Sequence, residues 1–378
     1  MAGKNRNYLI LAMVVIALMV TWWELGTGLV QTGSEPVMQN NFKTEARFYE
    51  TLEDGKVRCG ICFRNCVIAP GERGFCKARE NKDGVLYSLV YGLPSALQRD
   101  PVEKEPMFHV EPGSSIYCIG TASCNFRCRH CHNWHLSQLT IEEVRSYYQR
   151  TPQDLVREAK DRGMPAISFT YNEPTILYEY IYDTARIAQE EGIRFIFHTN
   201  GSMNPEPLRK LLPHVDAVTV DLKGFTEEFY REISQARLEP VLNTLEIIRE
   251  EGVWLEIVNL VIPGFNDDPE EIREMCGWIK ENLGSQTPIH FTRFTPAYRL
   301  TGVQPTPVET LEMAHRIAGE EGLEYVYIGN VPGHIHNSTF CPDCGETLIQ
   351  RYHFSVHQVN IDEGKCKNCG NEIPGIWP

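Results

Sequence analysis

The cysteines constrain this chain more than any other residue type. The sequence contains 13 of them, and all but Cys276 fall into three groups of four. Cys-x2-Cys and Cys-x3-Cys spacings place sulfur atoms on one loop or turn, where they converge on a metal more readily than they bridge distant strands. A disulfide scaffold is the alternative, but a chain of 378 residues can build its own core without such crosslinks. The groups are Cys59, Cys62, Cys66 and Cys76; Cys118, Cys124, Cys128 and Cys131; and Cys341, Cys344, Cys366 and Cys369.

Composition indicates a globular protein and excludes one class of partner. Hydrophobic residues make up 42% of the chain and charged residues 23%, which suits one large domain with small appendages. The formal net charge is −14, whereas non-specific nucleic-acid binding requires a basic surface that displaces counterions. We therefore expect no nucleic-acid partner.

Residues 8–23 form an apolar stretch without any charge, YLILAMVVIALMVTWW, which Lys4 and Arg6 precede. These 16 residues would span about 24 Å as a helix, slightly less than a bilayer core. Tyr8 and the Trp22–Trp23 pair would then lie at the two interfaces. We predict a single-pass membrane anchor over about residues 8–25 and a linker to residue 45. A cleaved signal peptide is the alternative, although no convincing small-residue cleavage site follows.

From about residue 112 to 330, short apolar runs alternate with amphipathic stretches, which is typical of βα units. Pro near the start and Gly after the end mark several of the helices. Six βα units predict an α/β fold with an open, TIM-like partial (β/α)6 barrel, although a doubly wound sheet would give a similar pattern. The expected strands are 116–119, 166–170, 194–199, 217–220, 254–261 and 288–294, and the expected helices are 152–162, 175–191, 205–212, 239–251, 269–282 and 307–321.

The domain organisation follows from these shifts in composition. Residues 1–45 form the anchor and linker, and residues 46–110 a small Cys-rich module. The barrel core covers residues 111–335. Residues 336–378 form a C-terminal, zinc-ribbon-like module with the last four cysteines.

The spacing Cys124-x3-Cys128-x2-Cys131 follows directly after the first expected strand. Loops at the carboxyl ends of parallel strands are where active sites form. Three thiolates on a four-iron cube leave one iron open, and a cluster that only transfers electrons has no use for such an opening. The amino and carboxylate groups of S-adenosylmethionine (SAM) can occupy it. A structural zinc loop is the alternative, and Cys118, on the strand itself, is expected to be a packed thiol.

This motif resembles the signature of the radical SAM superfamily. The wider sequences DPVEKEPMFHVEPGS and GTASCNFRCRHCHNW resemble the AmmeMemoRadiSam-system radical SAM enzymes, relatives of the pyruvate formate-lyase activating enzymes. The resemblance covers about residues 55–378. It implies a [4Fe–4S] cluster on Cys124, Cys128 and Cys131, reductive cleavage of SAM to a 5′-deoxyadenosyl radical, and hydrogen abstraction from a protein, a peptide or another substrate.

The resemblance also implies partners. These are a low-potential electron donor of the flavodoxin or ferredoxin kind, a protein substrate, and Memo-like or AMMECR-like proteins. The competing hypothesis is a membrane-tethered iron–sulfur and zinc protein that carries electrons or serves as a scaffold without turning over SAM.

The resemblance also implies roles for residues at the ends of the expected strands. His130, before the third cysteine, would lie against adenine, and Glu173 would bind the SAM amino group although the usual preceding glycines are absent. Asn200 would meet the ribose or the carboxylate. Pro263 would pack on adenine.

Three further residues would act on SAM and the substrate. Asp221 and Lys223 resemble the Asp-x-Lys of the activating enzymes, where both side chains face SAM and the substrate. A surface ion pair is the alternative for these two residues. His290 resembles a substrate-side histidine, and a core-packed histidine is its alternative.

The two flanking cysteine groups differ in their spacing. Cys341-x2-Cys344-Gly and Cys366-x2-Cys369-Gly form two knuckles, which predict a closed tetrahedral site for Zn²⁺ or a rubredoxin-like iron, with zinc favoured. The group Cys59, Cys62, Cys66 and Cys76 lacks the ferredoxin run of cysteines and predicts either zinc or an auxiliary [4Fe–4S] cluster.

Two signals disagree on the side of the membrane. Lys4 and Arg6 precede the apolar stretch and no Lys or Arg follows before Lys43, so the positive-inside rule places the rest of the chain outside. Reduced thiols and oxygen-sensitive clusters require the cytoplasm. We expect a protein of the cell membrane with a cytoplasmic catalytic domain, because two basic residues are a weak signal.

Overall fold

A computed structural model describes residues 43–377, which form one compact unit. The predicted membrane span over residues 8–25 lies outside the described residues. None of the helices between residues 43 and 377 combines the length and hydrophobicity that a membrane span requires.

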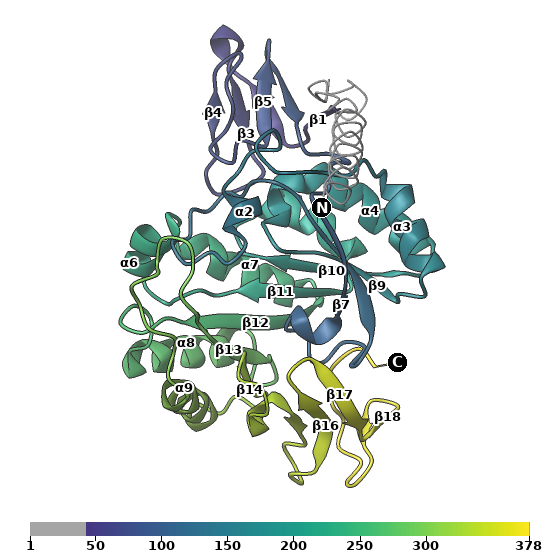
Figure 1. Cartoon of the computed structure of the whole chain (residues 1–378), viewed down its shortest axis with the longest axis vertical. Helices are drawn as coiled ribbons and strands as arrows, with labels where there is room; N and C mark the ends of the chain where they lie inside the picture. The colour runs from purple at the N-terminus through teal and green to yellow at the C-terminus, as the bar shows by residue number, and fades with distance from the viewer. Residues whose placement is uncertain (1–42, 378) are drawn as a thin grey trace, which may run out of the picture. The chain divides into compact units, whose positions relative to one another are not determined.

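One eight-stranded sheet forms the centre of the described chain (Figure 1). From β8 to β14 every strand pairs in parallel with the next one along the chain, and β7 pairs antiparallel with β8 at one edge. The strands are β7 (Ala96–Pro101), β8 (Ser115–Gly120), β9 (Ala166–Phe169), β10 (Arg194–Thr199), β11 (Ala217–Asp221), β12 (Trp254–Val261), β13 (Ile289–Arg293) and β14 (Val326–Gly329).

This strand order decides between the two predicted architectures. A doubly wound sheet reverses its strand order at a switch point, whereas here the order never reverses. Successive right-handed crossovers between neighbouring strands place all helices on one face and leave the other face as the barrel interior. The sheet stays open, because among the described strands β7 and β14 form its two edges. The open, singly wound α/β barrel is therefore confirmed.

The strand count differs from the prediction at both edges. The sequence predicts six parallel strands, and β14 is a seventh, which was missed because its four residues are too few to show a period. β7 lies inside the predicted Cys-rich module yet completes the barrel sheet by pairing along its whole length with β8.

Six of the helices match the predicted positions and their boundary signals, and two short helices, α2 and α6, were not predicted. Thr151 and Asp154 form a capping box at the start of α3, and the Asp268 side chain caps α8. The helices are α2 (Trp134–Ser137), α3 (Pro152–Asp161), α4 (Tyr178–Glu190), α5 (Pro205–Leu211), α6 (Glu227–Phe229), α7 (Glu239–Glu250), α8 (Pro269–Asn282) and α9 (Val308–Glu320). Among the shorter turns are η3 (Val102–Lys104) and η4 (Pro174–Leu177).

The N-terminal module consists of two small sheets that share the barrel's hydrophobic core. One sheet contains β1 (Thr44–Glu45), β6 (Val85–Ser88) and β5 (Arg79–Lys82), and the other contains β2 (Tyr49–Thr51), β3 (Val57–Cys59) and β4 (Val67–Ile68). Arg79 of β5 forms a buried ion pair with Glu179 of α4, with 2.8 Å between Nη2 and Oε2. The module is therefore fixed to the barrel by charge as well as by packing.

The C-terminal module lies at the bottom of the view in Figure 1, opposite the N-terminal module at the top. Its strands are β15 (Thr339–Phe340), β16 (Thr347–Tyr352), β17 (Ser355–Val359), β18 (Ile361–Asp362) and β19 (Lys365–Cys366). Buried Arg351 of β16 donates to the carbonyl of Phe108 at 2.7 Å and lies 3.6 Å from a carboxylate oxygen of Glu103 in η3. A backbone bridge between Val110 and Ile376 closes the module against the barrel.

Candidate active site

A cavity of about 400 Å³ lies at the carboxyl ends of the parallel strands. This volume lies in the range of pockets that bind small molecules. Of the core residues predicted from the sequence, all but Pro263 line it. They are Cys124, Cys128, Cys131, His130, Glu173, Asn200, Asp221, Lys223 and His290.

The loop after β8 holds the three cysteines through backbone contacts. Ser123 takes a left-handed conformation, with φ of 79°, which turns the chain immediately before Cys124. The amide of Phe126 donates to Cys124 Sγ at 3.3 Å. Ser137 Oγ of α2 lies 3.1 Å from Cys131 Sγ. Amide and hydroxyl donors at sulfur favour thiolate ligands.

The sulfur positions test whether this loop suits a single ion or a cluster. A tetrahedral Zn²⁺ with bonds of about 2.3 Å holds its sulfurs about 3.8 Å apart. Among residues 43–377, the C-terminal four cysteines are the only group of three or more such ligands whose atoms all lie within 4.8 Å of one another. The triad lines one cavity but is more widely spaced. This wider spacing is compatible with an iron–sulfur cube, in which each cysteine binds a different iron, and it differs from the spacing around a single tetrahedral ion.

Burial makes these thiols poor acids on their own. Burial raises the pKa of Cys124 well above its ordinary value, and it raises the pKa of Cys128 to about 11 although Lys223 acts in the opposite direction. Metal binding must therefore displace the thiol protons. Cys118 stays outside the site as predicted, since it is buried on β8 and donates to Glu105 Oε1 at 3.2 Å.

Glu173 follows β9 and is buried, with its carboxylate facing backbone donors. It accepts hydrogen bonds from the amide of Thr175 at 2.9 Å, the hydroxyl of Thr199 at 2.8 Å and the amide of Asn200 at 2.7 Å. Burial raises its pKa. Three donors fix the orientation of the carboxylate at the cavity wall and leave lone pairs for a further donor such as an ammonium group.

The glycines that usually precede this glutamate are absent here, and Tyr171 takes the backbone conformation that a glycine would favour. Its φ is 69°. Asn172 fixes this turn, because its side chain accepts from the amide of Thr121 at 3.1 Å and donates to the carbonyl of Ser123 at 2.8 Å. These two hydrogen bonds hold the turn in place and connect the segment before Glu173 to the loop that carries the cysteines.

Asn200 follows β10, and its side chain is used within the protein. It donates to Asn125 Oδ1 at 2.9 Å and accepts from the Ser202 hydroxyl at 2.6 Å. Asn125 is the residue after Cys124. Asn200 therefore supports the cysteine loop, in addition to lining the cavity.

A chain of charged side chains starts at the cavity wall with Lys223, Asp221 and His198 and ends at Glu105 behind it. Lys223 Nζ lies 2.8 Å from Asp221 Oδ2, and Asp221 Oδ1 lies 3.4 Å from His198 Nε2. His198 Nδ1 lies 3.1 Å from Glu105 Oε2. Burial disfavours a charge on His198, but Asp221 and Glu105 outweigh it and raise the pKa of His198 to about 10. The imidazole is therefore cationic at neutral pH and joins two carboxylates.

His290 of β13 both lines the cavity and belongs to the core. Its Nε2 lies 2.7 Å from Glu256 Oε2, and its ring stacks on Tyr327 with 4.9 Å between centroids. Burial lowers its pKa. Glu256 also accepts from the amides of Phe108 and His109 at 2.9 and 2.8 Å, which fixes the segment between β7 and β8.

His130 and Pro263 differ in their placement. His130 is buried against the cavity, and burial lowers its pKa to about 3, so the ring is neutral. Its Nδ1 has no hydrogen-bond partner within the described protein. Pro263 lies in the loop after β12 and does not line the cavity, whereas Val258 and Leu260 of β12 do. The predicted role of Pro263 against adenine therefore has no support from this geometry.

Several lining or supporting residues were not identified from the sequence. Glu105 reaches the site from the segment after η3, and no local spacing relates it to His198. His353 and Phe354, at the turn between β16 and β17, bring the C-terminal module to the cavity. In the sequence, no motif or spacing marked these residues as part of the site.

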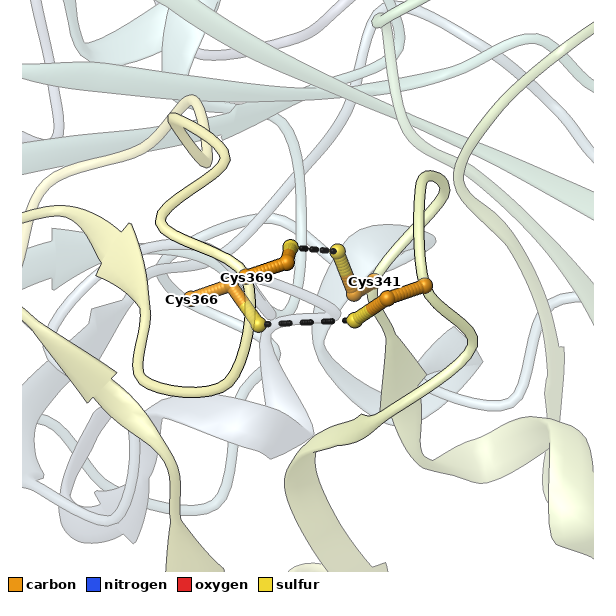
Figure 2. Close-up of side chains that lie close together, drawn as sticks. Cys341, Cys366 and Cys369 are labelled. Atoms are coloured by element: carbon orange, nitrogen blue, oxygen red, sulfur yellow. Dashed lines mark hydrogen bonds between the residues drawn. The ribbon is translucent and has the colours of Figure 1, made fainter.

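The C-terminal cysteines form a separate, compact group that could hold a metal ion. The Cys341 and Cys369 sulfurs lie 3.6 Å apart, and those of Cys344 and Cys366 lie 3.8 Å apart (Figure 2). Gly345 and Gly370 take φ of 72° and 78°, and their amides donate back to Cys341 and Cys366. Two equivalent knuckles thus face each other at the spacing of a tetrahedral four-thiolate ion.

Comparison with known proteins agrees with this geometry. Residues 118–276 match the family model described as Radical SAM superfamily. The Methanocaldococcus jannaschii protein named Uncharacterized protein MJ0808 is 48% identical over 331 residues, which cover 87% of this chain and 98% of that protein. The chain belongs to the radical SAM superfamily.

Two further similarities are more distant. The pyruvate formate-lyase-activating enzyme of Clostridium pasteurianum is 26% identical over 163 residues, covering 42% of this chain and 66% of that enzyme. The crystal structure of Streptococcus suis SuiB bound to S-adenosylmethionine aligns with a TM-score of 0.46 and 15% identity, covering 61% of this chain and 53% of SuiB.

Proposed function

We propose that this protein is an activating-enzyme-like radical SAM enzyme that abstracts a hydrogen atom from a protein or peptide substrate. The observation that carries the proposal is the convergence of Cys124, Cys128 and Cys131 with Glu173, Asp221 and Lys223 on one cavity. A protein that only carried electrons would need none of the last three residues at its cluster.

The chain's residues would divide the work at this cavity. When bound, the cluster supplies the electron that cleaves SAM to methionine and a 5′-deoxyadenosyl radical. Glu173, held by three donors, would accept a hydrogen bond from the SAM amino group. Neutral His130 would pack beside the adenine ring. Asp221 and Lys223 would orient SAM against the substrate.

The partners and the metal of the C-terminal module are part of the proposal. A flavodoxin- or ferredoxin-like protein would supply electrons, as expected for relatives of activating enzymes. Resemblance to AmmeMemoRadiSam-system enzymes adds Memo-like or AMMECR-like proteins as partners. The compact C-terminal site would hold structural zinc, and the N-terminal four cysteines would hold a second metal centre.

We also propose that residues 8–25 anchor the enzyme to the cell membrane with its catalytic domain in the cytoplasm. The uncharged apolar stretch supports the anchor, and the reducing conditions that the cysteines require support the cytoplasmic side. Protease protection of a C-terminal tag in sealed vesicles would test the orientation.

Anaerobic incubation of the reconstituted, dithionite-reduced protein with SAM tests the catalytic proposal. We expect 5′-deoxyadenosine and methionine as products, and their loss in Cys128→Ala. Cys276→Ala removes a buried thiol of α8 far from any cysteine group in the sequence and is the matched control. Product formation by Cys128→Ala, or no SAM cleavage by the wild type, would refute the proposal and favour the electron-carrier hypothesis.

A further inference from the structure

We propose that Cys59, Cys62, Cys66 and Cys76 bind a second [4Fe–4S] cluster, and that this cluster passes electrons to the one on Cys124, Cys128 and Cys131. The first part rests only on the N-terminal module. The second part rests on the proposed function, because it says by which route the electron for SAM cleavage reaches the cluster of the triad.

The four cysteines surround one small, largely enclosed cavity. Cys59 ends β3, Cys66 precedes β4, Cys76 precedes β5, and all four residues line the same space. None of them forms a disulfide. Apolar side chains of Ile61, Ile68 and Ile176 form much of the remaining wall. Four convergent thiols in such a setting are a metal site.

The spacing of the sulfurs selects the kind of metal centre. The C-terminal knuckles hold their sulfur pairs 3.6 and 3.8 Å apart, as a single tetrahedral ion requires. Among the described residues, no three of the N-terminal sulfurs lie within 4.8 Å of one another. The same wider spacing applies to the cysteine triad of the active site. The N-terminal sulfurs are therefore spaced more widely than the ligands of a single tetrahedral ion, which favours a cube with one cysteine on each iron over zinc.

Two guanidinium groups in the cavity wall complement an anionic centre. Arg64 and Arg79 both line the cavity, and Arg79 is 1% exposed. The two terminal nitrogens of Arg79 donate to Glu179, while Nε of Arg79 is buried and has no hydrogen-bond partner among residues 43–377. An unpaired buried N–H costs free energy unless it finds an acceptor. Thiolate or cluster sulfur in the adjoining cavity would supply that acceptor.

Asn125 connects this cavity to the active site. It follows Cys124 in the chain and lines the N-terminal cavity. Its carbonyl accepts from Arg64 Nε at 2.7 Å, and its side chain is held by Asn200 and Ser202. The ring of Phe63, next to Cys62, packs edge-on against Phe126 with 5.9 Å between centroids. The two cysteine groups thus share a wall made of adjacent residues and direct hydrogen bonds.

The electron balance of the relay is simple. One electron leaves a reduced flavodoxin- or ferredoxin-like donor and reduces the N-terminal cluster from the 2+ to the 1+ state. The same electron then passes to the cluster of the triad, which goes from 2+ to 1+, and the N-terminal cluster returns to 2+. No bond forms or breaks in this step, and the electron is finally used in SAM cleavage.

Iron analysis of the full chain, reconstituted without oxygen, tests the second cluster. We expect about eight iron and eight sulfide per wild-type chain, and about four of each in the variant Cys62→Ala with Cys76→Ala. Cys276→Ala should keep about eight. Retention of the C-terminal metal and of the remaining cluster absorbance shows that the double variant is folded. A wild type with about four iron, or zinc that disappears in the double variant, would overturn the cluster assignment.

Comparison of two electron sources tests the relay. The rate of 5′-deoxyadenosine formation is measured with reduced flavodoxin and with dithionite, a small reductant that does not need to dock. In the double variant we expect the flavodoxin-to-dithionite rate ratio to fall by about tenfold or more. An unchanged ratio would overturn the relay even if the second cluster is present. Absence of SAM cleavage by the wild type with dithionite would instead refute the proposed function, leaving the iron count as a separate result.

A potentiometric titration of the wild type, followed by electron paramagnetic resonance, keeps the cluster testable if the double variant does not fold. Two [4Fe–4S]¹⁺ signals with separate midpoints are the expected result, and a single signal accounting for one cluster per chain would contradict it.

Discussion

The ammonium group of Lys223 lies 2.8 Å from the carboxylate of Asp221, at the carboxyl end of β11 and on the wall of the cavity that the cysteine triad lines. The side chains are only 15% and 27% exposed, so this is not the surface ion pair that the sequence left open. Burial opposes both charges, but their mutual attraction keeps the pKa of Asp221 well below and that of Lys223 well above its ordinary value. A fixed, ionised pair therefore lines the cavity.

We expect Asp221→Ala and Lys223→Ala to retain the iron–sulfur cluster and to lose about 10²-fold in substrate-dependent turnover, because positioning groups contribute at this scale. Single-turnover measurement of 5′-deoxyadenosine, together with iron content, checks this expectation. Lys160→Ala is the matched control, since Lys160 pairs with Glu191 at 2.6 Å on the exposed surface. Near-wild-type rates with an intact cluster in both site variants would remove Asp221 and Lys223 from the site.

The protonation of His198 should make the stability of the fold depend on pH. Its pKa is raised from 6.5 to about 10, because Asp221 and Glu105 outweigh the effect of burial. A raised pKa means that the folded state binds the proton more tightly, so the stabilisation is complete below pH 6.5 and is lost as the pH rises towards about 10.

We therefore expect the free energy of unfolding of the wild type to fall between pH 7 and pH 10 more steeply than that of His198→Gln, which has no such proton. Urea unfolding at several pH values, under anaerobic conditions, gives both slopes. Equal slopes in the two proteins would mean that His198 is neutral in the fold.

The barrel could be predicted because its signals are local. Apolar runs such as Arg194–Thr199 and Trp254–Val261 match β10 and β12 residue for residue, and the three cysteines follow the strand that the pattern predicts. Strand ends meet at one edge of a parallel sheet, so Glu173 and Asp221 could be placed near the cysteines as well.

The remaining features depend on contacts between segments that are distant in the sequence. Glu105 meets His198 across 93 residues, and no spacing rule relates the two. The sequence also left open whether the two flanking cysteine groups hold the same metal. The distance between sulfurs, which bears on that choice, depends on how several loops fold. Pro263 was placed on adenine by resemblance alone, and it is not among the residues that line the cavity.

The C-terminal knuckles should hold one metal independently of the active site. We expect Cys341→Ser with Cys344→Ser to lose that metal and to become thermally labile, because the module's small core includes both Cys341 and Cys366. The cluster absorbance should persist. Metal analysis and thermal denaturation check this, and an unchanged content of zinc and iron in the variant would contradict the assignment.

The ion pair between Arg79 and Glu179 should be among the most sensitive positions for stability. Both side chains are almost fully buried, and the carboxylate binds the guanidinium through two hydrogen bonds of 3.0 and 2.8 Å. Removing one partner leaves an uncompensated buried charge, which costs about 3 to 5 kcal/mol. Glu179 also accepts from the backbone amide of Arg47 at 2.8 Å, so its loss loosens the attachment of the N-terminal module to α4.

We expect Glu179→Gln to lower the free energy of unfolding by about 3 to 5 kcal/mol in anaerobic urea denaturation. Glu250→Gln, which breaks the exposed pair with Arg209 at 2.6 Å, should cost less than about 1 kcal/mol. The variant Arg79→Met with Glu179→Met should be less destabilised than Glu179→Gln, because it leaves no unpaired charge behind. If the double variant is the less stable of the two, the cost comes from lost packing or from the cysteine cavity beside Arg79, and not from the unpaired charge.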